Sequence, residues 1–405
     1  MIKVYSHLEE ILTLSSALKK DGRNLTLDDL SILKNASIVF DEDQILWVGA
    51  TKDLPSHFLS EKSFNLSGHC LTPGLVDSHT HLLFGGDRSL EYTQRLSGKT
   101  YQEIASEGGG ILLTMKQTNA LSREEVLEVC RKRIKNFISF GVKLLEIKSG
   151  YGLNLEKEVL YSRIISELKN EFRNEITIKN TCMVAHDVPP GFSSSRQYMD
   201  QVVKPTIEKL LSEDILDFVD IFHEKNYFSS DDVREVARLV SGSSVGLRLH
   251  ADELNDNDGA ALATELNASS ADHLLQVSDR GISALSQSST VATLLPGTAL
   301  FLGKSFAPSQ KMLKSGVKLA IASDYNPGSC HFDQVLQIAS MTAAPLKLNL
   351  AQLWSGITLN PSHSLNEKKM GAIVVGHKPC FTLFKAPTIA TITYEWGKNL
   401  SVTEP

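Results

Sequence analysis

The stretch Leu71-Thr-Pro-Gly-Leu-Val-Asp-Ser-His-Thr-His81 decides the fold, because an apolar run here ends in a His-x-His pair. Residues two positions apart on a strand share a face, so His79 and His81 present their imidazoles to one point. Neutral imidazole is the commonest side-chain ligand of catalytic metals. Short motifs also occur by chance, so the pair indicates a metal site only if partners follow elsewhere in the chain.

Composition is that of a large globular enzyme. The 405 residues carry a formal net charge of −6, with 42% hydrophobic and 22% charged residues. No cluster of lysine or arginine offers the basic surface that nucleic acid or an anionic membrane attracts, so we expect neither partner and expect a small-molecule substrate. No apolar run approaches the roughly 20 residues that cross a bilayer, and the amino terminus lacks the apolar core of a signal peptide. We therefore expect a cytoplasmic protein.

The five cysteines are scattered and include no C-x-x-C pair. The sequence therefore predicts neither a disulfide framework nor a cysteine zinc site.

The two ends of the chain predict a small β-domain. Residues 36–40 and 44–48 alternate in polarity around an acidic turn, which predicts a hairpin. Near the other end, short strands are predicted at 371–376 and 380–384, and the stretch 389–394 continues this β-rich pattern. We expect residues 1–70 and 366–405 to pair into one small discontinuous β-sandwich domain.

The region 71–365 alternates strand and helix patterns. Apolar strands are predicted at 71–76, 142–147, 176–183, 218–222, 245–249, 268–272, 290–295 and 317–322. Several are continuously apolar, as parallel strands buried on both faces are. A helix is expected over 122–140, where Ser122 and Glu125 form a capping box. These eight units predict an α/β protein with a (β/α)8 TIM barrel rather than an open doubly wound sheet.

Polar side chains follow nearly every predicted strand, at the end where barrel enzymes build their active sites. They are Asp77, His79 and His81 after the first strand, Lys148 and Tyr151 after the second, His186 after the third, His223 and Glu224 after the fourth, His250 and Glu253 after the fifth, Asp272 and His273 after the sixth, and Asp324, Asn326 and Ser329 after the eighth. Structural histidines would not gather so regularly at one edge.

Four of these side chains form the predicted metal shell, with three imidazoles, one carboxylate and a position left for water: His79, His81, His250 and Asp324. This set suits one divalent metal, either zinc or ferrous iron. Taken singly, each histidine could also be a satisfied structural side chain. Lys148 could bridge two metals as a carbamate, but a one-metal shell is complete without it.

Three further side chains are candidates for the chemistry. Glu253 can face the cavity without binding the metal and transfer a proton, or it is simply an acid at the amino end of a helix. His273 can orient water or stabilise an anionic intermediate, or it is a core histidine. Arg88 suits a bidentate grip on a carboxylate, although an isolated loop arginine is more often a surface charge.

Other residues could complete a ligand pocket. Tyr151 and His186 can add hydrogen-bond donors, or Tyr151 simply caps a loop after Ser149-Gly150. Asn326, Gly328 and Ser329 offer an amide, close backbone access and a hydroxyl, or they form a proline-glycine turn. The run Gly108–Gly110 lacks the frame of a nucleotide loop, so we expect a mobile loop that can cover the site.

The same residues carry a resemblance to a known superfamily. Its motifs are Val76-Asp-Ser-His-Thr-His81, Gly85-Gly-Asp-Arg88, Lys148-Ser-Gly-Tyr-Gly152, Ala185-His186 before Pro189-Pro190, His250-Ala-Asp-Glu253, Ala271-Asp-His273, Leu295-Pro-Gly297 and Ala322-Ser-Asp-Tyr-Asn-Pro-Gly-Ser329. Over nearly its full length the chain resembles the amidohydrolase superfamily, and within it the enzymes that open an imidazolone ring in histidine degradation. The resemblance implies metal ligands at His79, His81, His250 and Asp324, substrate contacts at Arg88, Tyr151, His186, Asn326, Gly328 and Ser329, and proton transfer by Glu253 and His273.

The implied reaction is hydrolysis of 4-imidazolone-5-propanoate to N-formimidoyl-L-glutamate by metal-activated water, with zinc or iron as the metal and a homodimer as the assembly. The chain departs from the family at His223, where cysteine is usual, and at Pro379-Cys-Phe381, where Ala-Asp-Leu is common. Both departures lie outside the predicted shell. Two other functions stay open: a deaminase of nucleobases or cyclic amidines, which uses the same His-x-x-Glu pattern, and a non-catalytic binding protein on the same barrel.

Overall fold

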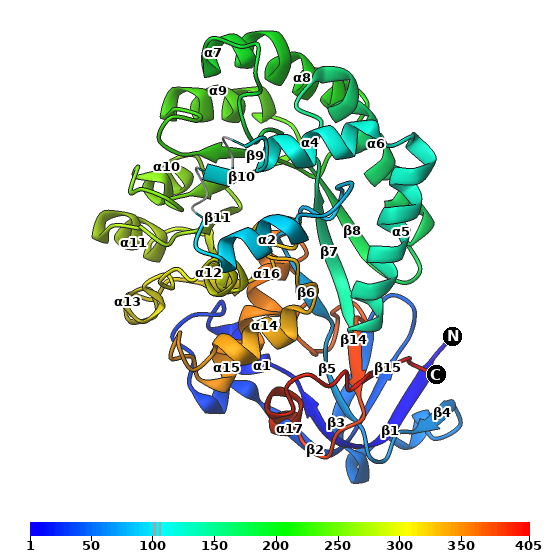
Figure 1. Ribbon diagram of the computed structural model, residues 1–405. Helices are drawn as coiled ribbons and strands as arrows, with labels where there is room; N and C mark the ends of the chain where they lie inside the picture. The colour runs from blue at the N-terminus through cyan, green and yellow to red at the C-terminus, as the bar shows by residue number, and fades with distance from the viewer. Residues whose placement is uncertain (100–102, 105–106) are drawn as a thin grey trace.

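The barrel predicted for the middle of the chain dominates the computed structural model, which describes residues 1–99, 103–104 and 107–405 (Figure 1). Eight parallel strands form one sheet in the order β13-β12-β11-β10-β9-β8-β7-β6. They are β6 (Leu75–Asp77), β7 (Val142–Lys148), β8 (Thr177–Ala185), β9 (Phe218–His223), β10 (Gly246–Ala251), β11 (Ser270–His273), β12 (Val291–Leu294) and β13 (Leu319–Ile321). The strands are buried almost throughout, as strands covered on both faces must be. The TIM barrel is therefore confirmed.

The barrel closes just beyond the carboxyl ends of its first and last strands. Thr80 and Tyr325 form a parallel bridge there. Beside it, the backbone N–H of His81 donates to Tyr325 O and the N–H of Asp324 donates to His79 O, each over 3.0 Å. The closure therefore brings predicted metal ligands from β6 and β13 together.

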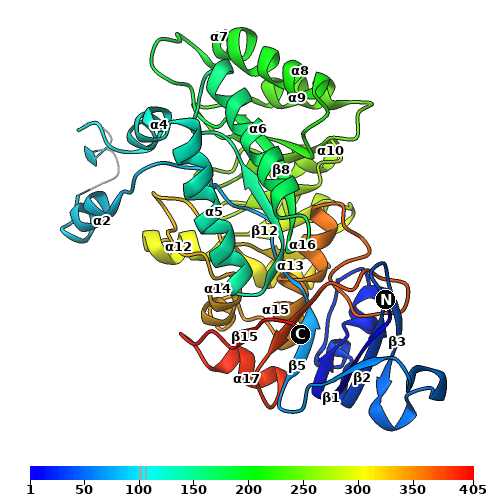
Figure 2. The same cartoon turned by 90° about the vertical axis from the view of Figure 1, so that its right-hand side faces the viewer.

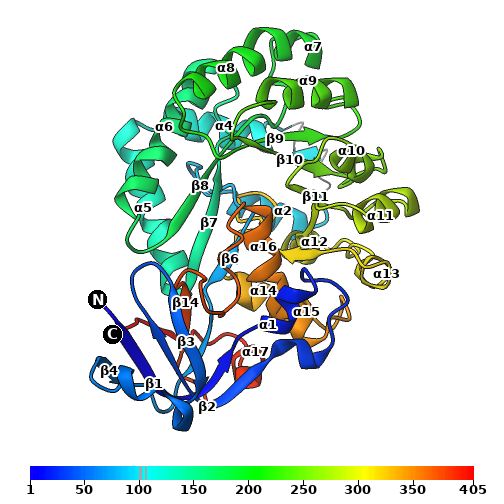
Figure 3. The same cartoon turned by 180° about the vertical axis from the view of Figure 1, so that it is seen from behind.

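Most helices surround the barrel, as the views from the front and from behind show (Figures 1 and 3), whereas α17 (Ile389–Tyr394) lies beside the sheet formed by the chain ends. Along the chain they are α1 (Ser15–Lys19), α2 (Ser89–Leu96), α4 (Ile111–Ala120), α5 (Arg123–Ser139), α6 (Leu155–Glu171), α7 (Ser195–Tyr198), α8 (Lys204–Ser212), α9 (Ser230–Val240), α10 (Gly259–Glu265), α11 (Asp279–Ser286), α12 (Pro296–Leu302), α13 (Ser309–Lys314), α14 (Val335–Thr342), α15 (Leu350–Gly356), α16 (Leu359–Ser364) and α17 (Ile389–Tyr394). The capping box predicted at Ser122 and Glu125 begins α5. Figure 2 shows α2 standing out from the body of the barrel.

Both chain ends lie at a second, smaller sheet (Figures 1 and 2). Its strands are β1 (Lys3–Leu12), β2 (Ile32–Phe40), β3 (Ile45–Ala50), β4 (Lys62–Asn65), β5 (Cys70–Pro73), β14 (Phe381–Phe384) and β15 (Ser401–Val402). The strands expected as a sandwich are thus hydrogen-bonded into one seven-stranded mixed sheet, drawn from both termini. Its core cluster includes Tyr5, Ile38, Leu71 and Phe381.

The predicted strand 71–76 is divided between the two sheets. β5 pairs with β14 in the small sheet, whereas β6 pairs with β7 in the barrel. Gly74 separates them, and a Cβ there would lie 2.7 Å from Lys143 Cβ and 2.8 Å from Cys380 Sγ. The close approach of these side chains explains why the junction uses glycine.

Two predictions near the carboxyl terminus are wrong. Residues 389–394 form helix α17 rather than strand, because Thr388 caps it and the buried Glu10 carboxylate accepts the N–H of Ile389 over 2.8 Å. Tertiary contacts here override the β-propensity of a Thr/Ile-rich run. Residues 371–376 are not a strand but a loop whose Ile373 N–H donates to Thr13 O.

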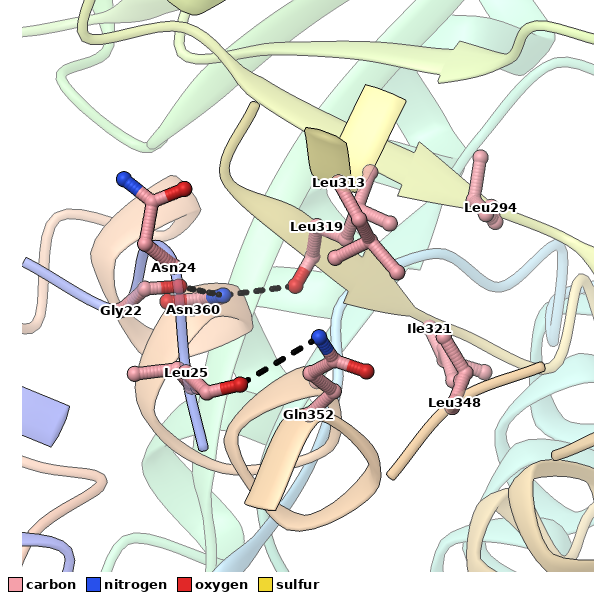
Figure 4. A pocket seen from close by; sticks show the side chains of 11 residues that line it. Gly22, Asn24, Leu25, Leu294, Leu313, Leu319, Ile321, Leu348, Gln352 and Asn360 are labelled. Atoms are coloured by element: carbon pink, nitrogen blue, oxygen red, sulfur yellow. Dashed lines mark hydrogen bonds between the residues drawn. The ribbon is translucent and has the colours of Figure 1, made fainter. Parts of the chain in front are cut away.

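The small domain also contacts the barrel through the loop after α1. Asn360 of α16 donates to Gly22 O over 3.2 Å and to Leu319 O of β13 over 2.7 Å (Figure 4). Gln352 of α15 reaches Leu25 O of the same loop (Figure 4). The pocket in this figure is lined by five leucines, one isoleucine and five glycine or amide residues, and by none of the predicted site residues. It lies where the loop after α1 meets the barrel, apart from the predicted site.

No helix among the described residues is long and apolar enough to cross a membrane. All five cysteines are free thiols, and four of them are buried.

Candidate functional site

The predicted metal ligands meet at the carboxyl end of the barrel. Nε2 of His79 lies 3.7 Å and Nε2 of His81 lies 3.6 Å from Oδ1 of Asp324. Nε2 of His250 lies 3.4 Å from Nε2 of His81. All four side chains are buried. The structure therefore places ligand atoms of His79, His81 and Asp324 within 4.8 Å of one another, with His250 beside His81.

The donor spacing fits a bound metal. An ion with bonds of about 2.1 Å and room for a fifth ligand holds neighbouring ligand atoms about 3.0 to 3.6 Å apart, close to the three separations given above. Nε2 of His79 is buried and has no hydrogen-bond partner. Burial raises the pKa of Asp324, so burial disfavours its charged form. A cation bound in the cluster would stabilise that charged form. Three imidazoles and one carboxylate are the donors that zinc or ferrous iron accepts.

Two buried carboxylates turn the histidines toward the cluster. Nδ1 of His79 lies 2.7 Å from Oδ2 of Asp272, and Nδ1 of His250 lies 3.1 Å from Oδ1 of Asp220. A carboxylate can only accept, so each Nδ1 carries the proton and each Nε2 presents its lone pair to the cluster. Such contacts fix the tautomer and ring orientation of histidines that bind metals.

Each of these carboxylates is paired in turn with a buried cation. Lys148 Nζ lies 2.7 Å from both Asp220 and Glu146. Arg248 lies 3.1 Å from Asp272 and also donates to Ser78 O. These side chains are fully buried, so the pairs offset charges that would otherwise be costly beneath the cluster.

The electrostatics favour neutral imidazoles at His79 and His81 and a charged ammonium group at Lys148. Burial, with the Lys148 charge, holds the pKa of His79 well below its ordinary value, and burial with His186 does the same to His81. Burial also acts to lower the pKa of His250, but Asp220 outweighs it and the pKa is raised. Burial likewise opposes the charge on Lys148, yet Asp220 and Glu146 raise its pKa. Its ammonium form is not the nucleophile that carbamate formation requires.

Asp324 is held by both backbone and side chain. Its φ of 52° lies in the left-handed region, which a short polar residue tolerates better than most. Oδ2 accepts a 2.5 Å hydrogen bond from Thr298 on α12, which leaves Oδ1 facing His79 and His81.

Glu253 and His273 lie next to the cluster. Oε2 of Glu253 is 3.6 Å from Nε2 of His273. The His273 ring centroid lies 5.1 Å from that of His250 and 5.6 Å from that of His79. The helix-terminus alternative for Glu253 is not what the structure shows, because Asp252 accepts the first N–H groups of α10 instead. His273 has a left-handed φ of 77°, a strained conformation of the kind found at functional sites.

Tyr151 and His186 line the cluster on another side. His186 stacks on His81 with ring centroids 4.8 Å apart, and Tyr151 lies 5.4 Å from His186. Nδ1 of His186 lies 3.0 Å from Gly150 O, which can only accept. Burial lowers the pKa of His186 to about 3, so the ring is neutral and its Nε2 accepts hydrogen bonds. The donor of His186 is thus used within the protein, and the expectation that this residue contacts a substrate stays a prediction.

Arg88 is held against the turn after Asp324. Its Nε and one terminal nitrogen donate to Oε2 of Glu91 over 2.8 and 2.6 Å. The other terminal nitrogen lies only 2.0 Å from where a Cβ on Gly328 would be. Glu91 also accepts the N–H of Gly110 over 3.0 Å, which connects Arg88 to the predicted loop 108–110. Arg88 is therefore a fixed, partly buried side chain rather than a free surface charge.

Asn326 and Ser329 form the turn that the sequence offered as an alternative. Oδ1 of Asn326 accepts from the N–H groups of Gly328 and Ser329, each over 2.8 Å. Its amide donates to Asp324 O and to Ser329 Oγ. The polar atoms of Asn326 are thus occupied within the turn, and Gly328 is placed where Arg88 passes.

Sequence reasoning missed several residues that organise the site: Glu91, Glu146, Asp220, Arg248 and Thr298. One signal was readable. Asp220 and Arg248 each interrupt an otherwise apolar predicted strand, and a buried charge requires a partner.

Comparison with known proteins agrees with this geometry. The model of the amidohydrolase family matches residues 70–404. The chain belongs to the amidohydrolase family.

Curated relatives narrow the assignment within the family. Proteins named imidazolonepropionase from Fusobacterium nucleatum, Bdellovibrio bacteriovorus and Bacillus cereus are 36%, 33% and 35% identical to this chain. The matches cover 92%, 96% and 96% of this chain and 91%, 90% and 92% of those proteins. The chain therefore belongs with the imidazolonepropionases.

Solved structures share the fold. A zinc-bound adenosine deaminase from Xanthomonas campestris has a TM-score of 0.71 at 14% identity, over 98% of this chain and 90% of that one. An atrazine chlorohydrolase from Arthrobacter aurescens, complexed with zinc, has a TM-score of 0.70 at 13% identity, over 98% and 92%. At such identities the likeness establishes the architecture alone.

Proposed function

We propose that this chain catalyses the imidazolonepropionase reaction, the hydrolysis of 4-imidazolone-5-propanoate to N-formimidoyl-L-glutamate. The name shared by its curated relatives supports this substrate. Oxygen from water forms a new bond to the ring carbonyl carbon, and the bond from that carbon to the ring nitrogen breaks. Both nitrogens remain in the product, so no ammonia is released.

One divalent ion per chain, zinc or iron, would be held by His79, His81, His250 and Asp324. When bound, such an ion supplies a Lewis acid and makes hydroxide available from water at neutral pH. The neutral state of His79 and His81 and the position of Asp324 favour its binding.

Glu253 is the proton carrier in this proposal. It takes a proton from the attacking water and gives it to the ring nitrogen as the carbon–nitrogen bond breaks. The observation that carries the proposal is that this carboxylate lies beside the histidine cluster, 3.6 Å from His273, yet outside the four-residue donor set. His273 donates to the carbonyl oxygen as it gains negative charge.

The remaining residues bind and orient the substrate. Arg88 binds the propanoate carboxylate with a charge-assisted hydrogen bond from its nitrogen next to Gly328. His186 accepts the ring N–H at Nε2, because its Nδ1 is committed to Gly150 O. The hydroxyl of Tyr151 donates a hydrogen bond to the substrate. Asn326 and Ser329 support the turn that carries Gly328.

A product assay tests the proposal. Purified protein loaded with zinc or with ferrous iron is mixed with 4-imidazolone-5-propanoate, and the products are identified by mass spectrometry alongside an ammonia assay. The expected product is N-formimidoyl-L-glutamate without ammonia. Ammonia release would support the deaminase alternative, and absence of turnover with full metal occupancy would support a binding protein. Elemental analysis gives the metal and its stoichiometry.

Two further expectations belong to the same proposal. The homodimer is tested by light scattering of the purified protein. The cytoplasmic location is tested by fractionation of the source cells.

A further inference from the structure

The loop that carries Glu253 connects β10 to α10 and spans residues 252–258. Its first residue, Asp252, has a left-handed φ of 52° and holds the loop through its carboxylate. Oδ1 of Asp252 accepts from the N–H groups of Asn257 and Gly259 over 3.1 and 2.8 Å, and Oδ2 accepts from Ala260 over 2.9 Å. Asp252 thus closes the loop onto the beginning of α10.

On its other side the loop is held by Glu224, a buried residue just after β9. Oε2 accepts from the N–H groups of Leu254 and Asn255 over 2.8 and 3.2 Å. Oε1 accepts from the side-chain amides of Asn255 and Asn257 over 3.0 and 2.8 Å, and from the N–H of Lys225 over 2.8 Å. Most of the donors around this carboxylate therefore come from the residues directly after Glu253.

Glu253 has little else to orient it. Its side chain is 16% exposed, and its ion-pair contact within the described part of the chain is the 3.6 Å approach to His273, which is too long for a strong hydrogen bond. The direction of its carboxylate therefore depends on the backbone between Asp252 and Leu254. Glu224 fixes the Leu254 side of that backbone.

We propose that Glu224 is a positioning residue that holds the 252–258 loop so that the Glu253 carboxylate points at the reacting atoms. The proposal rests on the proton-transfer role given to Glu253 in the proposed function. Glutamine cannot replace Glu224. Its amide nitrogen would point N–H groups at N–H groups of the loop, which now donate to the carboxylate. A displacement of about 1 Å at a catalytic group can cost on the order of a hundredfold in rate.

The test combines the variants Glu224→Gln, Glu253→Gln and the double variant. We expect Glu224→Gln to keep its metal and to change KM little, while kcat falls about ten- to a hundredfold because proton transfer is misaligned. The double variant should turn over no more slowly than Glu253→Gln alone, since Glu224 acts only through Glu253. The amides of Leu254 and Asn255 should exchange hydrogen faster in Glu224→Gln than in the unmodified protein.

Asp232→Asn is the matched control. Asp232 is also a buried carboxylate that accepts backbone N–H, from Ser229 over 2.9 Å, but it caps α9 and does not contact the 252–258 loop. This variant should lose stability without a comparable loss of kcat. Asn257→Ala, which removes one donor to Glu224 without leaving a buried charge, should show a smaller loss of kcat of the same kind and serves if Glu224→Gln does not fold.

Two results would overturn the proposal. Unchanged exchange at Leu254 and Asn255 in Glu224→Gln, or in Asn257→Ala if the first variant does not fold, would show that Glu224 does not hold the loop, whatever Glu253 does. Rate losses that simply multiply in the double variant would show that Glu224 acts independently of Glu253. By contrast, a wild-type rate for Glu253→Gln would refute the proton-transfer role in the proposed function and, with it, the catalytic purpose of the loop contact.

Discussion

The backbone N–H of Asp324 donates to the carbonyl oxygen of His79 over 3.0 Å, and this bond joins the last strand of the barrel to the first. The same two residues face each other through their side chains, with His79 Nε2 3.7 Å from Asp324 Oδ1. Barrel closure and the donor cluster therefore depend on the same few residues. A site fixed by backbone hydrogen bonds between strands is ordered before any ligand arrives, so binding loses less conformational entropy.

Asp324→Asn should keep the fold and lose the metal. Asparagine tolerates the left-handed φ of 52° and can still accept from Thr298, but it removes the charge that partly neutralises a dication. We expect elemental analysis after dialysis to find little metal, with activity lost in parallel. Full metal occupancy in Asp324→Asn would contradict the assignment.

Thr298→Val should weaken metal affinity by roughly ten- to a hundredfold, as expected for a residue that orients a ligand.

Asp272→Asn should affect both stability and metal affinity. The substitution leaves Arg248 buried without its charged partner, a change that costs about 3–5 kcal/mol of unfolding free energy. It also weakens the contact that fixes the tautomer of His79, so metal affinity should fall about ten- to a hundredfold. Denaturant unfolding and competition with a chelator measure the two effects. An affinity equal to that of the unmodified protein would mean that the cluster does not need this support.

Glu253→Gln should keep its metal and lose turnover. The amide preserves the shape of the side chain but cannot carry the proton, and removal of a positioned general acid/base slows catalysis by roughly a hundredfold or more. Steady-state kinetics over a range of pH provide the measurement. If the rate were unchanged, the proton would have to be carried by His273 or by solvent.

The gathering of these candidate metal ligands could be predicted from sequence because it follows local rules. His79 and His81 share a strand face by the period of two, and His250 and Asp324 follow apolar runs at the end where barrel sites lie. The carboxylate and cation partners could not be assigned in this way. Asp220 on β9 contacts Lys148 on β7, so pairing them requires the neighbour order of the strands.

The wrong predictions share a physical cause. Residues 389–394 contain isoleucine and threonine that favour strands, yet a distant glutamate caps the segment as a helix. Residues 371–376 likewise read as a strand, yet the N–H of Ile373 donates to Thr13 O in a loop. The local sequence pattern identifies candidate elements and residues here, whereas contacts with residues distant in the sequence determine their conformation.

Gly328→Ala should impair substrate binding through Arg88. The new Cβ would lie 2.0 Å from a terminal nitrogen of Arg88, so the guanidinium must move away from the position that Glu91 gives it. Because a charge-assisted hydrogen bond contributes about 1.5–3 kcal/mol, we expect kcat/KM to fall by roughly ten- to a hundredfold, with metal content unchanged.

Arg88→Met provides the comparison for this prediction. It should produce a loss of similar size, and combining it with Gly328→Ala should add little, since both changes remove the same contact. A substrate analogue without the propanoate carboxylate should distinguish the unmodified protein from the variants only weakly. An equal loss on both substrates would mean that Arg88 supports the structure of the site rather than the carboxylate.

Asp187→Asn should stabilise the protein at neutral and alkaline pH. Burial raises the pKa of Asp187 from 3.8 to about 6, so the folded state favours the protonated carboxyl. A folded pKa above the unfolded one gives stability that is present below pH 4 and is lost as pH rises through about 6. Asparagine can still accept from Val188 N–H and carries no charge. We expect a gain of about 1 to 2 kcal/mol at pH 8, reduced from the full linkage value because the side chain is partly exposed.

Glu367→Gln is the matched contrast, because the lysine partners of Glu367 shift its pKa in the opposite direction from that of Asp187. Burial acts to raise the pKa of Glu367, but Lys378 and Lys179 outweigh it and the pKa is lowered. The stability that it contributes is therefore present above the unfolded pKa and is lost as pH falls through the folded one. Denaturant unfolding at pH 4 and pH 8 should show Asp187→Asn gaining relative stability with rising pH and Glu367→Gln losing it. Parallel curves for Asp187→Asn and the unmodified protein would show that Asp187 is ionised in the folded state at little cost, so that burial in this loop does not penalise its charge.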